Sequence, residues 1–162
     1  TFQPWIISCA IILPILDYGR RHNKFLYRIY SNLFITFTRP IEQGILSGAS
    51  WVIIGAAVTI FIFNENTAII GLLVLSIADS AAAIVGIKFG KTQLFSKSLE
   101  GSTAFFITAT IIVFSLSSAA AYVNFIAVIA ATVVELFSTP RINDNLLIPM
   151  VLALILTIGG VG

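Results

Sequence analysis

The stretch TAIIGLLVLSIADSAAAIVG, residues 67–86, decides the fold class. Its residues are apolar or small, apart from the single acidic residue Asp79, and the next charge along the chain is Lys88. About 20 predominantly apolar residues are what an α-helix needs to cross the hydrocarbon core of a bilayer. We therefore predict a membrane helix over residues 67–88.

Five further apolar segments accompany this helix, at residues 2–16, 44–63, 101–119, 121–138 and 145–161. The chain of 162 residues is 58% hydrophobic and 10% charged, whereas soluble domains carry roughly 25% charged residues. Only helices and closed barrels span lipid, and these segments lack the alternation of barrel strands. The sequence predicts an all-α, polytopic integral membrane bundle of about six spans, forming one domain over residues 1–162. Because position 1 is not Met, we expect the N-terminus to be truncated.

The basic residues lie in alternate connections between these segments. Five of the nine Lys and Arg lie within residues 20–39, three follow the third segment, and Arg141 follows the fifth. The positive-inside rule places such connections in the cytoplasm, at a bacterial inner membrane or at an endoplasmic reticulum or plastid membrane. Residues 20–39 also carry apolar residues at helical spacing between basic ones, which predicts an interfacial amphipathic helix without a catalytic role.

Residues 79–102, DSAAAIVGIKFGKTQLFSKSLEGS, contain a Gly-Lys-Thr but not a P-loop. The P-loop pattern requires a glycine where this chain has Val85, and it must follow a buried strand rather than a membrane helix. The chain has one cysteine and one histidine, which excludes an intrachain disulfide and a thiolate metal cluster.

Asp79 lies about 13 Å along the predicted helix from Lys88, at 1.5 Å per residue. Ionisable groups at such depth line a cavity or pair with a partner, and they mark functional sites by default. The same helical face carries small residues, namely Ala82, Ala83, Gly86 and Gly90. Small residues allow close approach of a ligand or of a neighbouring helix. We favour a functional role for Asp79 over a hydrogen-bonded residue in a helix contact.

The connection that follows this helix can bind phosphate. It offers three ammonium donors, on Lys88, Lys91 and Lys97. Ser98 can cap the fourth helix, with Glu100 in its first turn, and Gly101 and Ser102 would expose backbone N–H groups there. The alternative is an ordinary basic loop with a routine cap, and the residues alone do not decide between the two.

Acidic and amide residues also gather at the two last segments, where Glu135 closes one and Asp144 and Asn145 open the next. They lie at the same predicted membrane face as the lysine-rich connection. Mg²⁺ prefers one or two carboxylates together with phosphate oxygens and water. The candidate metal ligands are Asp79, Glu100, Glu135 and Asp144. Such a site suits an enzyme that joins a soluble phosphate compound to a membrane alcohol or lipid phosphate.

Three motifs carry a family resemblance. The run ADSAAAIVGIKFGKTQLFSKSLEGSTAFF, residues 78–106, resembles the CTP-dependent lipid-alcohol kinases, which comprise dolichol kinase, phytol kinase and the yeast-type diacylglycerol kinase. LSGAS, residues 46–50, is similar to that family's Leu-Thr-Gly-Ala-Thr. Glu135 followed by DNLLIP, residues 144–149, is similar to its Glu and Asp-Asn-Leu-x-x-Pro. The family's early helix with Arg-Lys and His has no counterpart before Trp5.

The resemblance implies a kinase that transfers the γ-phosphate of CTP, with Mg²⁺, to the hydroxyl of a polyprenol, phytol or diacylglycerol. It implies Asp79, Lys97 and Glu100 as catalytic residues. It implies nucleotide binding by Gly86, Lys88, Gly90, Lys91, Lys97, Ser98, Gly101, Ser102 and Asn145. Asp79 would hold Mg²⁺ together with Glu100, Glu135 or Asp144. The expected partners are a lipid alcohol, CTP and the bilayer, without nucleic acid, and a homo-oligomer is left open.

Two alternatives remain. A phosphatidate cytidylyltransferase, which transfers CMP to a lipid phosphate, has a distantly similar pattern, but its His-Gly-Gly and Asp-Arg-x-Asp signature is absent here. A small transporter would use Asp79 as a coupling-ion site, although the mid-span Gly or Pro breaks that favour it are few.

Overall fold

The computed structural model describes residues 3–19, 23, 25, 28, 47–138 and 143–161. They belong to two compact units, Thr1–Ala57 and Val58–Gly162, which we describe separately. The amphipathic helix predicted over residues 20–39 lies outside the described residues, apart from the isolated positions 23, 25 and 28.

In the first unit, a buried aspartate fixes the start of a helix. Helix α1 (Gln3–Gly19) ends shortly after Asp17, and α3 (Gly48–Ile62) begins in this unit. The fully buried Asp17 carboxylate accepts a hydrogen bond from the Ser47 backbone N–H (2.6 Å) and another from the Ser50 hydroxyl (2.8 Å). Since a helix N-terminus favours negative charge, Asp17 caps α3 from another helix.

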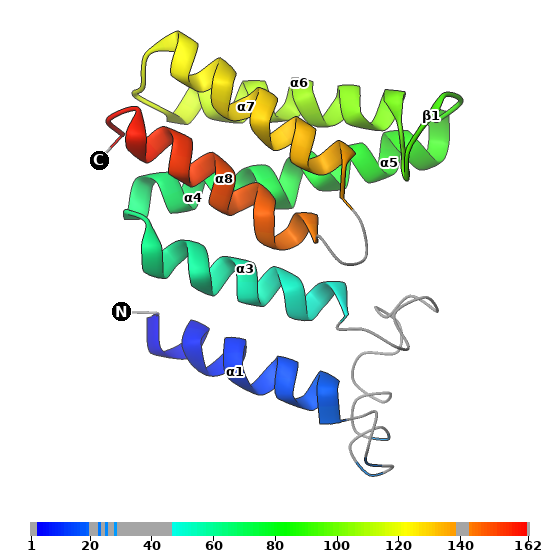
Figure 1. Cartoon of the computed structure of the whole chain (residues 1–162), viewed down its shortest axis with the longest axis vertical. Coiled ribbons are helices and arrows are strands. Elements are labelled where there is room, and N and C mark those ends of the chain that lie inside the picture. Colours follow the sequence, from blue (N-terminus) through cyan, green and yellow to red (C-terminus); the bar gives the residue numbers. More distant parts are fainter. Residues whose placement is uncertain are drawn as a thin grey trace. The chain divides into compact units, whose positions relative to one another are not determined.

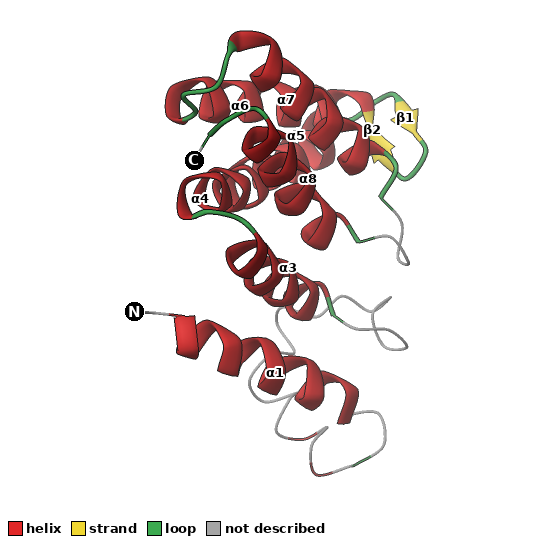
Figure 2. Cartoon of the chain, turned by 60° about the vertical axis from the view of Figure 1, so that its left-hand side comes forward, coloured by secondary structure: helices red, strands yellow, loops and turns green. Residues whose placement is uncertain are grey.

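After the end of α3, the second unit contains one continuous helix over residues 65–89, shown in green shades in Figure 1. It consists of α4 (Glu65–Leu73), the π-helical segment η3 (Val74–Ala78) and α5 (Asp79–Phe89). A short antiparallel hairpin follows, formed by β1 (Gln93–Leu94) and β2 (Lys97–Ser98). Figure 2 shows this hairpin in yellow. Three helices complete the unit: α6 (Leu99–Leu116), α7 (Ala121–Leu136) and α8 (Asp144–Ile158).

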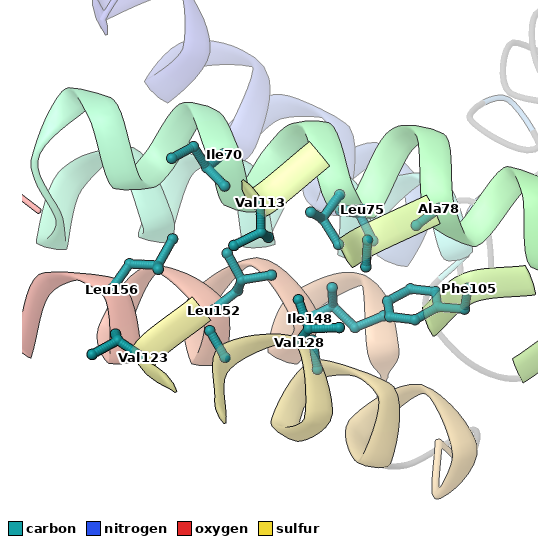
Figure 3. Packing of buried hydrophobic residues seen from close by; sticks show 14 of the residues in the cluster. Ile70, Leu75, Ala78, Phe105, Val113, Val123, Val128, Ile148, Leu152 and Leu156 are labelled. Atoms are coloured by element: carbon teal, nitrogen blue, oxygen red, sulfur yellow. The ribbon is translucent and has the colours of Figure 1, made fainter. Parts of the chain in front are cut away.

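These helices pack as a bundle around one core. The α5 half of the long helix lies against α6, its α4 half lies against α8, and α7 packs against both α6 and α8. Figure 3 shows the apolar side chains that meet between them, among them Phe105, Val113, Val128, Ile148 and Leu152. Fully buried alanines occupy α6 and α7 as well, which permits close contact between the helices.

The all-α fold class is confirmed for the described residues, with the two-stranded hairpin as an unpredicted addition. Each predicted apolar segment overlaps a helix, but within the described parts of the chain only residues 65–89 and α6 are long and apolar enough to cross a membrane by length and composition. The other apolar helices are shorter, so six spans are not confirmed. Many outward side chains are large and apolar, including Ile84, Ile107, Ile111, Ile126 and Ile129.

A close backbone contact joins α4 to α8. A Cβ added at Gly71 would lie 2.7 Å from the Pro149 carbonyl oxygen, and backbone cannot move aside as a flexible side chain can. We predict that Gly71→Ala lowers the free energy of unfolding by about 1–3 kcal/mol, because overpacking forces these helices apart. Thermal unfolding in detergent would show this as a lower midpoint. Ser76→Ala, on an exposed position of the same long helix, is the control, and an unchanged midpoint for Gly71→Ala would contradict the prediction.

Candidate functional site

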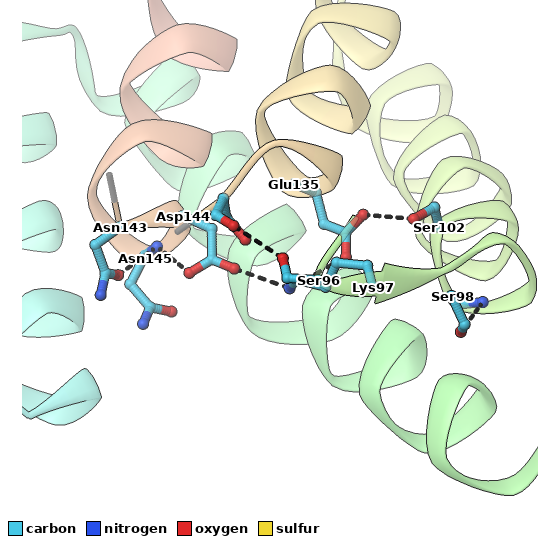
Figure 4. Close-up of polar contacts among 10 residues, drawn as sticks. Ser96, Lys97, Ser98, Ser102, Glu135, Asn143, Asp144 and Asn145 are labelled. Carbon is cyan, nitrogen blue, oxygen red and sulfur yellow. Dashed lines mark hydrogen bonds and ion pairs between the residues drawn. The ribbon is translucent and has the colours of Figure 1, made fainter. Parts of the chain in front are cut away.

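An ionic cluster lies where the hairpin, α7 and α8 meet (Figure 4). The Lys97 ammonium lies 3.0 Å from Asp144 Oδ2 and 3.2 Å from Glu135 Oε1. Glu135 is 1% exposed, and its other oxygen accepts a hydrogen bond from the buried Ser102 hydroxyl at 2.8 Å. We call these four residues, Lys97, Ser102, Glu135 and Asp144, the ionic cluster.

Local structure positions each member. Lys97 lies on β2, where Leu94 is its strand partner, so the hairpin directs it toward α7 and α8. The Ser96 hydroxyl donates a hydrogen bond to the Ser138 carbonyl (3.0 Å), which fastens the hairpin to the end of α7. Asp144 begins α8, whose N-cap is Asn143. The cluster therefore depends on contacts between segments distant in sequence.

Negative charge exceeds positive charge at the cluster. Burial alone would lower the pKa of Lys97, but the carboxylates of Asp144, Glu135 and Asp79 together raise it above its ordinary value. Lys97 is therefore protonated at neutral pH.

Hard oxygen ligands converge here on a cation. Glu135 and Asp144 both direct a carboxylate oxygen to the Lys97 ammonium, and carboxylate oxygens are also what Mg²⁺ prefers. Among the described residues, no group of three or more Asp, Glu, His or Cys side chains is arranged to hold a metal by itself. Two carboxylates are as many as Mg²⁺ takes from a protein when phosphate oxygens and water complete its coordination.

Glu100, a predicted metal ligand and catalytic residue, has a different partner. Its carboxylate accepts the Thr92 backbone N–H, at 3.2 and 3.3 Å for its two oxygens. Ser98 caps α6 as predicted, since its hydroxyl accepts the Gly101 N–H at 3.1 Å. That N–H, which we expected to be open to phosphate, is therefore already used.

The predicted nucleotide-binding glycines form a close helix contact. A Cβ on Gly90 would clash with the Gly86 carbonyl and lie 2.9 Å from Ser98 Cβ. A Cβ on Gly101 would lie 3.0 Å from the Ala82 carbonyl oxygen. Packing between α5 and α6 therefore explains these glycines without a ligand, and their contact with nucleotide stays a prediction.

The remaining predicted residues lie at the ends of helices. Lys88 and Lys91 are exposed at the end of α5 and just beyond it. Asn145 is half-buried in the first turn of α8, and its backbone N–H donates to the side chains of Asn143 and Asp144.

Sequence reasoning missed Asp17. The only available signal was a charged residue directly after the apolar run 2–16, together with the serines of LSGAS. In the structure these residues are hydrogen-bonded partners within the first unit.

Two proteins are similar to this chain over 94% of its length. The chain is 36% identical to uncharacterized protein RP860 of Rickettsia prowazekii, over 94% of this chain and 82% of that protein. It is 33% identical to uncharacterized protein MJ1137 of Methanocaldococcus jannaschii, over 94% of this chain and 78% of that protein. This chain belongs to their family.

Distant homology also links the family to lipid kinases. The chain is 33% identical to CTP-dependent diacylglycerol kinase 1 of Saccharomyces cerevisiae, over 65% of this chain and 38% of that enzyme. It is 26% identical to dolichol kinase sec59 of Schizosaccharomyces pombe, over 86% of this chain and 29% of that enzyme. The chain thus spans well under half of either kinase. No family model and no solved structure matches it.

A double-mutant cycle tests whether the ionic cluster is coupled. We predict that Lys97→Met destabilises the protein by about 2–4 kcal/mol, because it leaves the Glu135 carboxylate buried without its ammonium partner. Adding Glu135→Gln should recover part of this loss, since a neutral amide is easier to bury than a charge. Chemical denaturation of the two single variants and the double variant should give a coupling energy of about 1–3 kcal/mol. Additive effects would contradict the coupling.

Proposed function

We propose that this protein is an integral membrane kinase that transfers the γ-phosphate of CTP to the hydroxyl of a membrane lipid alcohol. The observation that carries the proposal is Lys97, whose ammonium lies between the carboxylates of Glu135 and Asp144. A cation among carboxylates, at one end of a bundle of apolar helices, suits a reaction between a charged phosphate compound and a lipid. The distant kinase relatives support the reaction class.

Membrane location is part of the proposal. Two apolar helices of spanning length and the exposed isoleucines of the bundle support it. The hairpin, the end of α7 and the start of α8 lie together at one end of the second unit, because Lys97 contacts both Glu135 and Asp144. We assign that end to the cytoplasm, where soluble nucleotide is available, in agreement with the positive-inside rule.

The proposed step is an in-line phosphoryl transfer. The lipid hydroxyl oxygen forms a bond to the γ-phosphorus, and the bond from that phosphorus to the β–γ bridging oxygen breaks, so CDP leaves. The hydroxyl proton passes to the Asp79 carboxylate. Lys97 stabilises the negative charge on the transferring group by its ammonium. We assign the base to Asp79 rather than to Glu100, because the Glu100 carboxylate is already hydrogen-bonded to the Thr92 N–H.

Glu135 and Asp144 would hold Mg²⁺, with Asp79 as a further candidate ligand. When bound, Mg²⁺ neutralises phosphate charge and orients the phosphates. Ser102 keeps Glu135 oriented through its hydrogen bond. Burial of Glu135 and the apolar helices below it limit the access of water to this carboxylate.

Position-specific labelling tests the reaction. Protein in lipid nanodiscs, with Mg²⁺ and a mixed lipid extract, receives CTP labelled on either the γ- or the α-phosphate. We expect label in the organic phase from the γ position alone, and none after chelation of Mg²⁺. Label from the α position would establish a cytidylyltransferase instead. Label from neither would overturn the enzyme proposal and favour transport.

Removing the charge of Asp79 should impair catalysis specifically. We predict that Asp79→Asn lowers kcat by about 10²-fold or more, because the acceptor of the hydroxyl proton is lost. The matched control is Glu65→Gln, which neutralises an exposed acid at the first residue of the same long helix. The rate of lipid phosphorylation is measured for wild type and both variants, after thermal unfolding has shown that the three proteins have equal midpoints. Full activity of Asp79→Asn would exclude a role for this residue as base or metal ligand.

A further inference from the structure

Two exposed phenylalanines flank the ionic cluster. Phe95, at the hairpin turn, is 70% exposed, and Phe137, directly after α7, is 52% exposed. Their ring centroids are 4.7 Å apart, with planes inclined by 43°. Phe95 lies two residues before Lys97, and Phe137 lies two residues after Glu135. The hairpin thus carries both Phe95 and Lys97, and the end of α7 carries both Glu135 and Phe137.

The backbone holds Phe95 in a conformation that its side chain does not favour. Its φ of 56° makes Phe95 the only non-glycine residue with positive φ within the described parts of the chain. Bulky residues rarely adopt this left-handed region, whereas Gly or Asn would occupy such a turn with less strain. Turn formation therefore does not explain a phenylalanine here. Strained residues persist where the surrounding structure fixes them, and they cluster at ligand sites.

A hydrogen bond joins the two segments that carry the rings. Ser96, the residue after Phe95, donates its hydroxyl hydrogen to the carbonyl of Ser138, the residue after Phe137. This bond joins the hairpin to the end of α7 beside each ring. The pair is therefore preorganised, and its exposed area is open to a planar ligand.

We propose that Phe95 and Phe137 form the nucleobase platform of the phosphate donor whose phosphates bind at the ionic cluster. This inference rests on the proposed function and adds the subsite for the base. Stacking on aromatic side chains contributes about 1–3 kcal/mol per base and tolerates any base, because every base has a π-face. The platform thus supplies affinity for the nucleoside part, and preference for one base arises elsewhere.

Exposed aromatic rings also occur at membrane interfaces, and substitution by leucine distinguishes the two roles. Leucine keeps an apolar side chain for lipid but removes the ring on which a base stacks. The chain provides a control in Phe114 of α6 and Phe125 of α7, whose rings form a second pair with centroids 4.9 Å apart. That pair lies near the opposite ends of both helices, remote from the ionic cluster.

Equilibrium binding tests the platform. Wild-type protein and the variants Phe95→Leu, Phe137→Leu, Phe114→Leu and Phe125→Leu, all in nanodiscs, are titrated with CTP, ATP and inorganic triphosphate in the presence of Mg²⁺. We expect Phe95→Leu and Phe137→Leu to weaken the binding of CTP and of ATP by similar factors, each about ten-fold. Triphosphate binding and the thermal midpoints should stay unchanged, and the control variants should bind like wild type.

The outcomes separate the platform from the proposed function. Wild-type CTP affinity in both Phe95→Leu and Phe137→Leu would overturn the platform and leave the kinase proposal standing. Equal weakening of CTP and triphosphate binding would also overturn it, because the effect would then lie in the phosphate site. Wild-type protein that binds neither nucleotide nor triphosphate would overturn the proposed function and the platform together. Phe137→Leu, at a position without backbone strain, keeps the test decisive if Phe95→Leu does not fold.

Discussion

The contact of Lys97 with Glu135 and Asp144 is the interaction on which the second unit's polar end depends. It joins the hairpin to the end of α7 and to the start of α8. Lys97 precedes Glu135 by 38 positions and Asp144 by 47 positions in the sequence. A buried carboxylate such as Glu135 is costly without a cation. The hydrogen bond from Ser102 orients the Glu135 carboxylate, and the hydrogen bond from Ser96 to the Ser138 carbonyl holds the hairpin at the end of α7. Both bonds therefore keep Lys97 and Glu135 within ion-pair distance.

Small residues at the helix contacts are the second constraint on the packing of this unit. Helices packed by Ala and Gly approach more closely than helices packed by larger side chains. In the second unit this allows α5 and the start of α6 to meet at Gly86, Gly90 and Gly101, and it allows α4 to meet α8 at Gly71. These contacts set how closely α6 lies to α5 and α8 lies to α4, while the N-caps Ser98 and Asn143 mark where α6 and α8 begin. Gly86, Gly90 and Gly101, which the sequence analysis assigned to a nucleotide-binding loop, are thus explained by helix packing without a ligand.

Prediction from the sequence succeeded where the signal was local. Apolar runs located the helices, and the Ser98 cap of α6 followed from residue type and position. Glu135 and Asp144 were expected at one end of the bundle with Lys97, and they are in contact there. The hairpin was missed because two-residue strands carry no periodicity. The π-helical segment before Asp79 and the Asp17–Ser47 contact were missed because each depends on how helices pack rather than on the residues nearby.

The sequence by itself determined that this chain forms apolar helices with basic and acidic residues at their ends, because hydrophobicity and helix caps act over a few residues. Tertiary structure alone decided which of those charges meet. In the folded chain Lys97 forms ion pairs with Glu135 and Asp144, and the Glu100 carboxylate accepts a hydrogen bond from the Thr92 N–H. The rings of Phe95 and Phe137 lie in contact. Hydrogen bonds and ion pairs form only between groups that lie about 3–4 Å apart. Partners distant in sequence are therefore chosen by the packing of the helices that carry them.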